Sequence, residues 1–264
     1  MTVQAKFKRV PDFHIRATLF EVTYEAQGLI VKGYLCIPQG TGPFPVLIYC
    51  RGGIKSVGMT RLAWVSKFVD QGCAVFAPFY RGNRGGQGRE DFAGEDRFDV
   101  IDALPWIKDH PLLEADRIHL FGFSRGSLMA LFTAMADPTI CSVVVWGGVS
   151  DLALTYEERV DLRRMLKRVL GGTPLRKPEE YRIRSPIYDV QRLKCPVLII
   201  HGTEDIQVGV EHSYILAEAL RETNKCYTLR IYENQGHFFQ PDVYKKAIDD
   251  MFTWMQKQEG RKHG

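Results

Sequence analysis

The chain has 264 residues, a length that fits one large domain. Hydrophobic residues make up 45% of it and charged residues 25%, which are ordinary values for a globular protein and exclude a disordered or collagen-like chain. The 35 basic and 31 acidic side chains leave a net charge of only +4, so the composition gives no reason to expect a nucleic-acid partner.

No feature of the sequence points to a membrane or to secretion. No apolar run approaches the roughly 18 residues needed to span a bilayer. The first ten residues also lack the apolar core of a signal peptide. The six cysteines are scattered without Cys-x-x-Cys spacing, which favours reduced, buried thiols over a metal site. We therefore expect a cytoplasmic protein without a membrane span or a bound metal.

Strands are predicted along the whole chain. Residues 18–26 and 29–37 flank a Gln-Gly turn and form a hairpin at the edge of a sheet, about seventeen residues after the start. Short apolar runs without polar alternation follow, and these are typical of strands buried on both faces of a parallel sheet. The runs are residues 46–50, 73–78, 118–121, 141–146 and 196–200. A last strand is predicted at residues 228–232.

Helices are predicted between these strands, because apolar residues recur there at helical spacing. The helical stretches are residues 62–69, 101–111, 128–135, 210–220 and 244–255. This alternation of strands and helices predicts an α/β domain. We expect a mostly parallel, twisted sheet of about eight strands with helices on both faces, all within one domain of residues 1–264.

One segment interrupts this alternation. About fifty residues separate the strand that ends at Trp146 from the next one, too many for a plain crossover. Residues 156–170 have helical spacing and stop at two glycines. Residues 155–185 contain nine basic and five acidic side chains, a local excess of four. We predict that residues 152–185 form a small helical insertion, either a solvated excursion or a cap whose charge favours anionic substrates.

Ser124 carries the strongest chemical signal, as the centre of Gly-Phe-Ser-Arg-Gly at residues 122–126. A Gly-x-Ser-x-Gly pentapeptide alone is a weak pattern, but a strand before it and a helix after it are typical of a nucleophile elbow. The glycines permit a sharp turn that raises the hydroxyl above the sheet, at a helix N-terminus that favours negative charge. The alternative is a serine that merely caps the helix.

A nucleophilic serine needs a base, and the base needs a group that orients it. In α/β-hydrolases the order along the chain is serine, acid, histidine. Asp205 follows a predicted strand and is the expected acid, with Glu204 as the first alternative. His237 follows the last strand, in a glycine-containing loop, and is the expected base. His201 ends a strand and is expected to form local hydrogen bonds instead.

Acyl transfer also requires two hydrogen-bond donors for the oxyanion. The backbone N–H of Arg125, directly after the nucleophile, is the first expected donor. The second should come from the loop after the strand at residues 46–50, which reads Arg-Gly-Gly-Ile. Gly53 is the first choice in that loop, although the two glycines are also explained by a turn.

Together these pieces resemble the prolyl oligopeptidase family of serine hydrolases, which has the α/β-hydrolase fold. The likeness spans the chain after the first 15 residues or so. It is carried by residues 50–53 (Cys-Arg-Gly-Gly), 79–88 (Phe-Tyr-Arg-Gly-Asn-Arg-Gly-Gly-Gln-Gly), 122–126, 185–187 (Ser-Pro-Ile), 201–205 (His-Gly-Thr-Glu-Asp) and 236–237 (Gly-His). The resemblance implies the same roles for Ser124, Asp205 and His237 that the residues predict by themselves.

The chain also departs from the family in two ways. Full-length relatives carry a β-propeller before the hydrolase domain, and we expect none here because too few residues precede the first predicted strand. Relatives often have His or Tyr at the position of Arg51, and such a Tyr can help to hold the oxyanion. The Arg51 guanidinium could contact the substrate, but we favour a structural ion pair.

We therefore expect an enzyme without a cofactor that cleaves carboxylic esters of small molecules through an acyl-enzyme intermediate. A peptidase that acts on short peptides or acylated amino acids is the alternative, and a catalytically inactive binding protein is a third hypothesis. A preference for anionic esters would follow from the charge of the insertion. A homodimer could form by pairing of the strand at residues 228–232.

Overall fold

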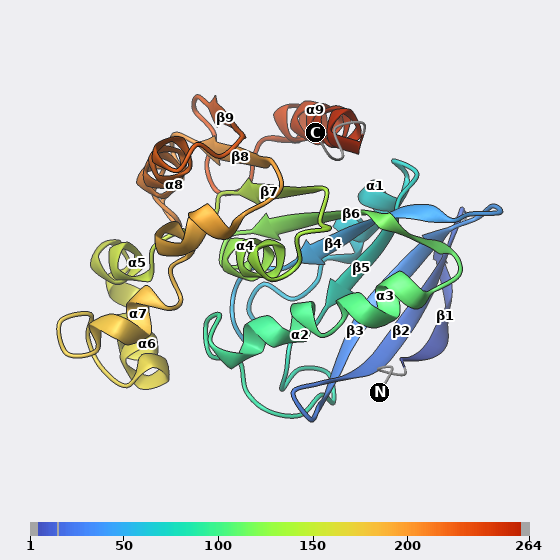
Figure 1. The fold of residues 1–264 in the computed structure, drawn as a ribbon, viewed down its shortest axis with the longest axis horizontal. Helices are drawn as coiled ribbons and strands as arrows, with labels where there is room; N and C mark the ends of the chain where they lie inside the picture. Colours follow the sequence, from blue (N-terminus) through green and yellow to red (C-terminus); the bar gives the residue numbers. More distant parts are fainter. Residues whose placement is uncertain (1–4, 15, 260–264) are drawn as a thin grey trace.

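The computed structural model describes residues 5–14 and 16–259, which form one nine-stranded sheet in the order β1-β2-β3-β5-β4-β6-β7-β8-β9 (Figure 1). The strands are β1 (Lys6–His14), β2 (Ala17–Ala26), β3 (Leu29–Pro38), β4 (Phe44–Cys50), β5 (Ala74–Pro78), β6 (Leu113–Phe123), β7 (Ser142–Trp146), β8 (Val197–Gly202) and β9 (Tyr227–Tyr232). From β5 to β9 the neighbouring strands run parallel, whereas β1, β2 and β3 are joined antiparallel. The predicted α/β architecture is confirmed.

Helices cover both faces of the sheet. They are α1 (Leu62–Val69), α2 (Phe98–Ile101), α3 (Leu104–Asp109), α4 (Gly126–Ala136), α5 (Leu152–Glu158), α6 (Arg163–Leu170), α7 (Pro178–Arg182), α8 (Glu211–Glu222) and α9 (Pro241–Glu259), with short 3-10 segments η1 (Glu95–Arg97), η2 (Val160–Leu162) and η3 (Pro186–Arg192). The apolar sides of α2, α3, α4 and α8 belong to one buried core, and those of α1 and α9 belong to a second. The sheet therefore separates two cores, and β5, β7 and β8 are buried along their whole length.

The prediction of about eight strands missed β1, so no seventeen-residue stretch precedes the first strand, and the predicted hairpin is not at the edge. Residues Lys6 to Arg9 of β1 are exposed, and Pro11 lies within the strand. Proline is tolerated at the edge of a sheet because its missing N–H is not needed by a second neighbour. An exposed, proline-containing edge strand gives no apolar run from which it could be predicted.

Two predicted helices are also divided in the structure. The stretch at residues 101–111 becomes α2 and α3, with Pro105 in the first turn of α3, where proline can begin a helix but not continue one. The stretch at residues 156–170 is broken at Arg159, whose φ of −107° and ψ of 77° are not helical. Apolar spacing alone did not reveal these breaks.

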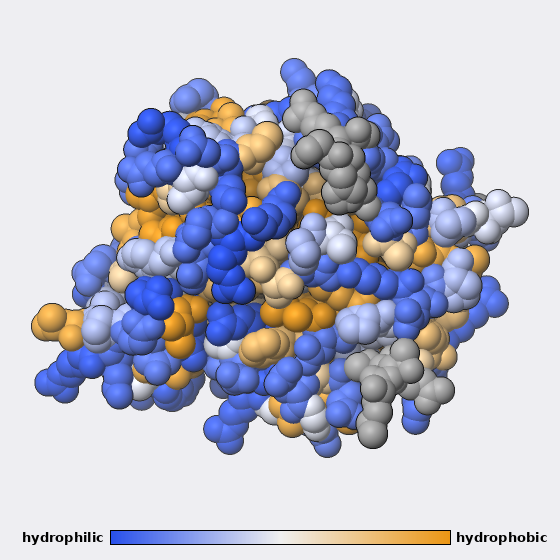
Figure 2. All heavy atoms as spheres, viewed as in Figure 1, coloured by the Kyte–Doolittle hydropathy of each residue, from blue (hydrophilic) through white to orange (hydrophobic). Residues whose placement is uncertain are grey.

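The insertion at residues 152–185 contains α5, α6 and α7, which Figure 1 shows as a group beside the α8 side of the sheet. Ser185 joins its two ends, since the hydroxyl accepts a hydrogen bond from the N–H of Leu152 (2.8 Å) and donates one to the carbonyl of Tyr181 (2.7 Å). Hydrophilic residues cover much of its outer surface in Figure 2. Among helices of the described residues, none combines the length and the apolar character of a membrane span.

Candidate active site

Ser124 occupies a strained turn between β6 and α4. Its φ of +55° lies in the left-handed region, which is uncommon for a residue with a side chain. Its N–H donates to the carbonyl of Trp146 (3.0 Å). A Cβ on Gly126 would lie 2.0 Å from the carbonyl oxygen of Cys50, so only glycine fits after the turn. This is the geometry of a nucleophile elbow.

His237 and Asp205 are joined at the same edge of the sheet, after β9 and β8. The Nδ1 atom of His237 lies 2.7 Å from Oδ2 of Asp205. Burial by itself raises the pKa of Asp205, but hydrogen bonds from His201 and His237 outweigh burial and hold this pKa below its ordinary value. An ionised Asp205 accepts a hydrogen bond from Nδ1–H of His237, and in that tautomer Nε2 can act as an acceptor. The side chain of Glu204 is exposed.

His201 supports the acid, as its predicted local hydrogen bonds now show. Its Nε2 atom lies 3.3 Å from Oδ2 of Asp205 and 2.8 Å from the carbonyl oxygen of Val208. The other carboxylate oxygen of Asp205 accepts the N–H groups of Gln207 (2.8 Å) and Val208 (2.9 Å). His201 and two backbone N–H groups thus hold the carboxylate that contacts His237.

Ser124 and His237 line one cavity of about 330 Å³, together with Gly52, Gly53 and Arg125. The hydrogen bonds of the described residues do not include one between the Ser124 hydroxyl and His237. The structure therefore brings the serine and the histidine to the same cavity without joining them directly. Proton transfer between them would require the two side chains to approach, and such contacts often form only when substrate is bound.

The loop after β4 lies directly against the nucleophile. A Cβ on Gly52 would lie 2.8 Å from Cβ of Ser124. Gly53 has a φ of +65°, and a Cβ there would lie 2.2 Å from the carbonyl oxygen of Val57. Among the hydrogen bonds of the described residues, none uses the N–H of Gly53 or of Arg125. Both groups are free to serve as donors at the cavity.

The side chain of Arg51 is fully buried and does not line this cavity. Its guanidinium forms an ion pair with Glu90 (2.8 Å), and the other carboxylate oxygen of Glu90 pairs with Arg125. The ring centre of Tyr80 lies 4.9 Å from the guanidinium carbon of Arg51 and 5.0 Å from that of Arg125. The structure thus places Arg51 in the ion pair that the sequence analysis favoured over substrate contact.

The acidic partners in this cluster had not been singled out in the sequence. Besides the two arginines, Glu90 accepts hydrogen bonds from the side chain of Asn83 (2.6 Å) and the N–H of Lys55 (2.8 Å). Asp96 pairs with Arg125 at 3.1 Å, and burial raises the pKa of Asp96 to about 7. Acidic residues in a polar loop are usually solvated, so the sequence carried no signal that these two are buried.

The rest of the cavity wall is mainly apolar. It includes Ile54, Val57, Phe92, Val149, Leu162, Met165 and Val208. The insertion contributes Leu162 and Met165, and also Arg159, which pairs with Asp161 (2.7 Å) and donates to the carbonyl of Gln207. Because this arginine is already paired, the insertion presents an apolar surface rather than a free positive charge to the cavity.

The comparisons with known proteins agree with this geometry. A sequence model of the prolyl oligopeptidase family matches residues 60–262. The chain is 46% identical over 259 residues to the uncharacterized peptidase YtmA of Bacillus subtilis (strain 168), a match that covers 98% of this chain and all of that protein.

Solved structures show the same fold. An acetyl xylan esterase from Paenibacillus sp. R4 superimposes with a TM-score of 0.76 at 18% identity, over 95% of this chain and 88% of the other. A puromycin-hydrolyzing peptidase from Mycobacterium tuberculosis gives a TM-score of 0.78 at 20% identity, over 98% of this chain and 46% of the other. Both have the α/β-hydrolase fold. The chain is a serine hydrolase that belongs to the prolyl oligopeptidase family.

Proposed function

We propose that Ser124, His237 and Asp205 act as a catalytic triad that hydrolyses carboxylic esters with an apolar acyl group. The observation that carries this proposal is the buried Asp205–His237 hydrogen bond of 2.7 Å beside a serine with positive φ, in one cavity. The hydrogen bond to Asp205 would fix the tautomer of His237 and leave Nε2 available to act as a base. The apolar wall and the volume of about 330 Å³ favour an acyl chain of moderate length.

The reaction would follow the acyl-enzyme route. Nε2 of His237 takes the proton of the Ser124 hydroxyl as Oγ attacks the ester carbonyl, and the N–H groups of Arg125 and Gly53 donate to the resulting oxyanion. The carbon–oxygen bond of the ester then breaks, and the alcohol leaves with the proton from His237. Water repeats the sequence on the acyl-enzyme, which releases the carboxylic acid and restores Ser124.

A peptidase that acts on short peptides or acylated amino acids is the second candidate. The similarity over nearly the whole chain to a protein named as a peptidase favours it. An amide nitrogen is a poorer leaving group than an alcohol, so protonation by His237 would matter more. Turnover of matched butanoyl esters and amides separates the candidates: amide turnover that equals ester turnover would favour the peptidase.

Labelling with a fluorophosphonate probe tests the nucleophile itself. We expect labelling of the wild-type protein and none of Ser124→Ala, together with a loss of ester turnover of about 10³-fold or more in this variant. Ser66→Ala, a change on α1 outside the cavity lining, is the matched control and should keep full labelling. An unlabelled wild-type protein that binds esters without turnover would favour the inactive binding protein.

Location and assembly also remain predictions. All six cysteines are free and five are buried, which supports a reducing, cytoplasmic compartment. In the sheet of the described residues, β9 has one neighbour only, so its outer edge could pair with a second copy. Light scattering of the purified protein measures whether the homodimer forms.

A further inference from the structure

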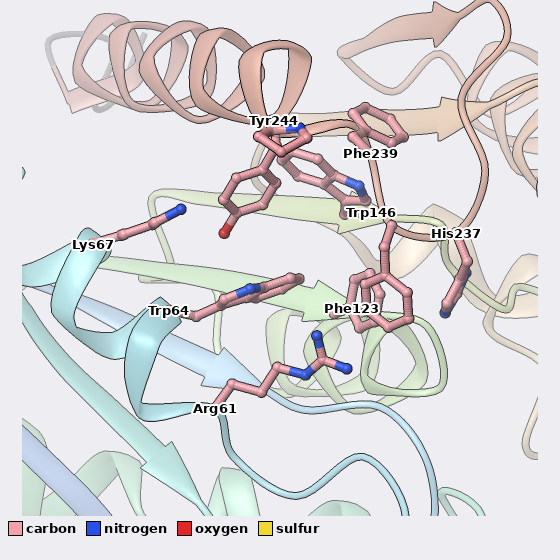
Figure 3. A pocket seen from close by; sticks show the side chains of 10 residues that line it. Arg61, Trp64, Lys67, Phe123, Trp146, His237, Phe239 and Tyr244 are labelled. Carbon is pink, nitrogen blue, oxygen red and sulfur yellow. The ribbon is translucent and has the colours of Figure 1, made fainter.

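A second cavity, of about 240 Å³, adjoins the first and is shown in Figure 3. It lies between α1, the loop that carries His237 and the start of α9. Its lining comprises Arg61, Trp64, Lys67, Phe123, Trp146, His237, Phe238, Phe239, Pro241 and Tyr244. Five of these, including Arg61 and His237, also line the first cavity, whereas Ser124 lines the first alone. The two cavities therefore share a wall that includes the imidazole.

The second cavity combines aromatic walls with two free cations. The guanidinium of Arg61 lies 4.3 Å from the ring centre of Phe238, and the ammonium of Lys67 lies 4.5 Å from that of Tyr244. Ring faces hold a cation in place without neutralising it. Neither cation forms an ion pair with another described residue, and the described lining contains no carboxylate. Positive charge is thus available to an anionic ligand.

Tyr244 adds a buried donor that lacks a partner. Its side chain is 9% exposed, and within the described part of the chain its hydroxyl has no hydrogen-bond partner. Figure 3 shows this hydroxyl pointing into the space between Lys67 and Trp64. Burial raises the pKa of Tyr244, so the hydroxyl keeps its proton. Because an unsatisfied buried hydroxyl is unfavourable, a ligand oxygen that accepts a hydrogen bond from it would be favoured here.

The position of the second cavity indicates which part of the substrate it would bind. The base of the triad must deliver its proton to the leaving group, so the leaving group lies next to the imidazole. The first cavity contains the nucleophile and has the apolar wall suited to an acyl chain. The second cavity adjoins the first along a wall that includes His237, so a leaving group beside the imidazole could extend into it.

We propose that the second cavity is a leaving-group subsite for an aromatic group that carries a carboxylate. The ring would contact Trp64 and Phe238, and the carboxylate would be bound by Arg61, Lys67 and the Tyr244 hydroxyl. This inference rests on the proposed function and narrows its substrate class. An ester of an aromatic hydroxy acid and an N-acylated aromatic amino acid both present such a leaving group.

Matched substrates test the proposal. The ester arm compares 3-(butanoyloxy)phenylacetate with its neutral N-methylamide; the methylene group separates the charge from the phenol, so the two leaving groups have similar basicity. The amide arm compares N-butanoylphenylalanine with N-butanoylphenylalaninamide. We expect kcat/KM to be about tenfold higher for the carboxylate at low salt, with a smaller ratio at about 0.5 M salt. The arm with the larger ratio identifies whether the leaving group is an aromatic hydroxy acid or an aromatic amino acid.

Substitutions locate the effect. Lys67→Gln should reduce the ratio to about threefold or less, and Tyr244→Phe should reduce it by a smaller factor. Lys194→Gln removes the same charge from an exposed residue before β8, at the opposite end of the strands, and should leave the ratio unchanged. A wild-type ratio near one in both arms, or equal ratios for Lys67→Gln and wild type, would overturn the proposal.

Binding of the product separates this inference from the proposed function. Calorimetry with 3-hydroxyphenylacetate needs no turnover, and we expect about tenfold weaker binding to Lys67→Gln than to Lys194→Gln. Equal binding to both variants overturns the subsite even if esters are cleaved. Weaker binding to Lys67→Gln supports the subsite even if Ser124 proves unreactive, in which case only the proposed function fails.

Discussion

Replacing Glu90 by glutamine tests the buried charge cluster beneath the nucleophile. The Glu90 side chain is 1% exposed and is shared by Arg51 and Arg125, whose side chains are 0% and 2% exposed. Glutamine keeps the volume but removes the charge. Arg125 would retain Asp96 at 3.1 Å, whereas Arg51 would lose the one carboxylate that pairs with it among the described residues.

The expected loss of stability follows from this arrangement. Removing one partner of a buried ion pair leaves an uncompensated charge and costs about 3–5 kcal/mol. For a protein of this size, each kcal/mol lowers Tm by about 2–4 °C, so we expect Glu90→Gln to melt about 6–20 °C below the wild type. Thermal denaturation followed by circular dichroism measures this shift. Glu218→Gln is the control, because Glu218 forms an exposed pair with Arg221 on α8 and its loss should not change Tm measurably.

A second substitution, at Arg51, tests whether the charges of Arg51 and Glu90 are energetically coupled. Arg51→Met removes the cation that Glu90→Gln leaves unpaired, so the double variant should be more stable than the sum of the two single losses implies. A Tm of Glu90→Gln within about 2 °C of the wild type would show that the cluster is not energetically coupled. Strictly additive losses in the double variant would lead to the same conclusion.

Further substitutions test the site. Asp205→Asn should lower kcat by about 10³–10⁴-fold in ester assays, because His237 loses the carboxylate that fixes its tautomer. Since the pKa of Asp205 is depressed, its contribution to stability is present above pH 4 or so and is lost below it; the difference in unfolding free energy between wild type and Asp205→Asn, measured in urea, should shrink in acid. Gly52→Ala would bring a Cβ to 2.8 Å from that of Ser124, so kcat should fall about 100-fold, and a wild-type kcat would refute the close contact. Met165→Trp should shift the preference toward shorter acyl chains in a series of p-nitrophenyl esters; an unchanged preference would place the acyl chain elsewhere.

Much of the fold could be predicted from the sequence because a parallel sheet demands continuous apolar runs. The strands β5, β7 and β8 are buried on both faces and stood out for this reason. Asp205 follows β8, Ser124 follows the buried end of β6, and His237 follows the half-buried β9. The carboxyl ends of these parallel strands meet at one edge of the sheet. The positions of these residues after parallel strands were therefore enough to predict that they lie close together.

The remaining parts of the site depend on packing between distant elements. Lys67 lies on α1 and Tyr244 lies on α9, and these helices are far apart in the sequence. Within its own helix, Lys67 is explained as a surface residue and Tyr244 as part of the buried apolar stripe. Their contact across the second cavity arises only when both helices pack on the same face of the sheet. For the same reason, the partner of Arg51 could not be identified from the residues beside it.

The insertion is connected to Arg125, the residue after Ser124, through a series of charged residues. Arg184 donates to the carbonyl of Asp91 (3.1 Å), the Asp91 carboxylate accepts the N–H of Asp96 (3.0 Å), and Asp96 pairs with Arg125, the residue after Ser124. Swinging the whole insertion outward would break the hydrogen bond and the ion pair (3.6 Å) that Arg184 forms with Asp91. We therefore expect substrates to gain access by rotation of individual side chains that line the cavity, such as Leu162, while the helices around them stay in place.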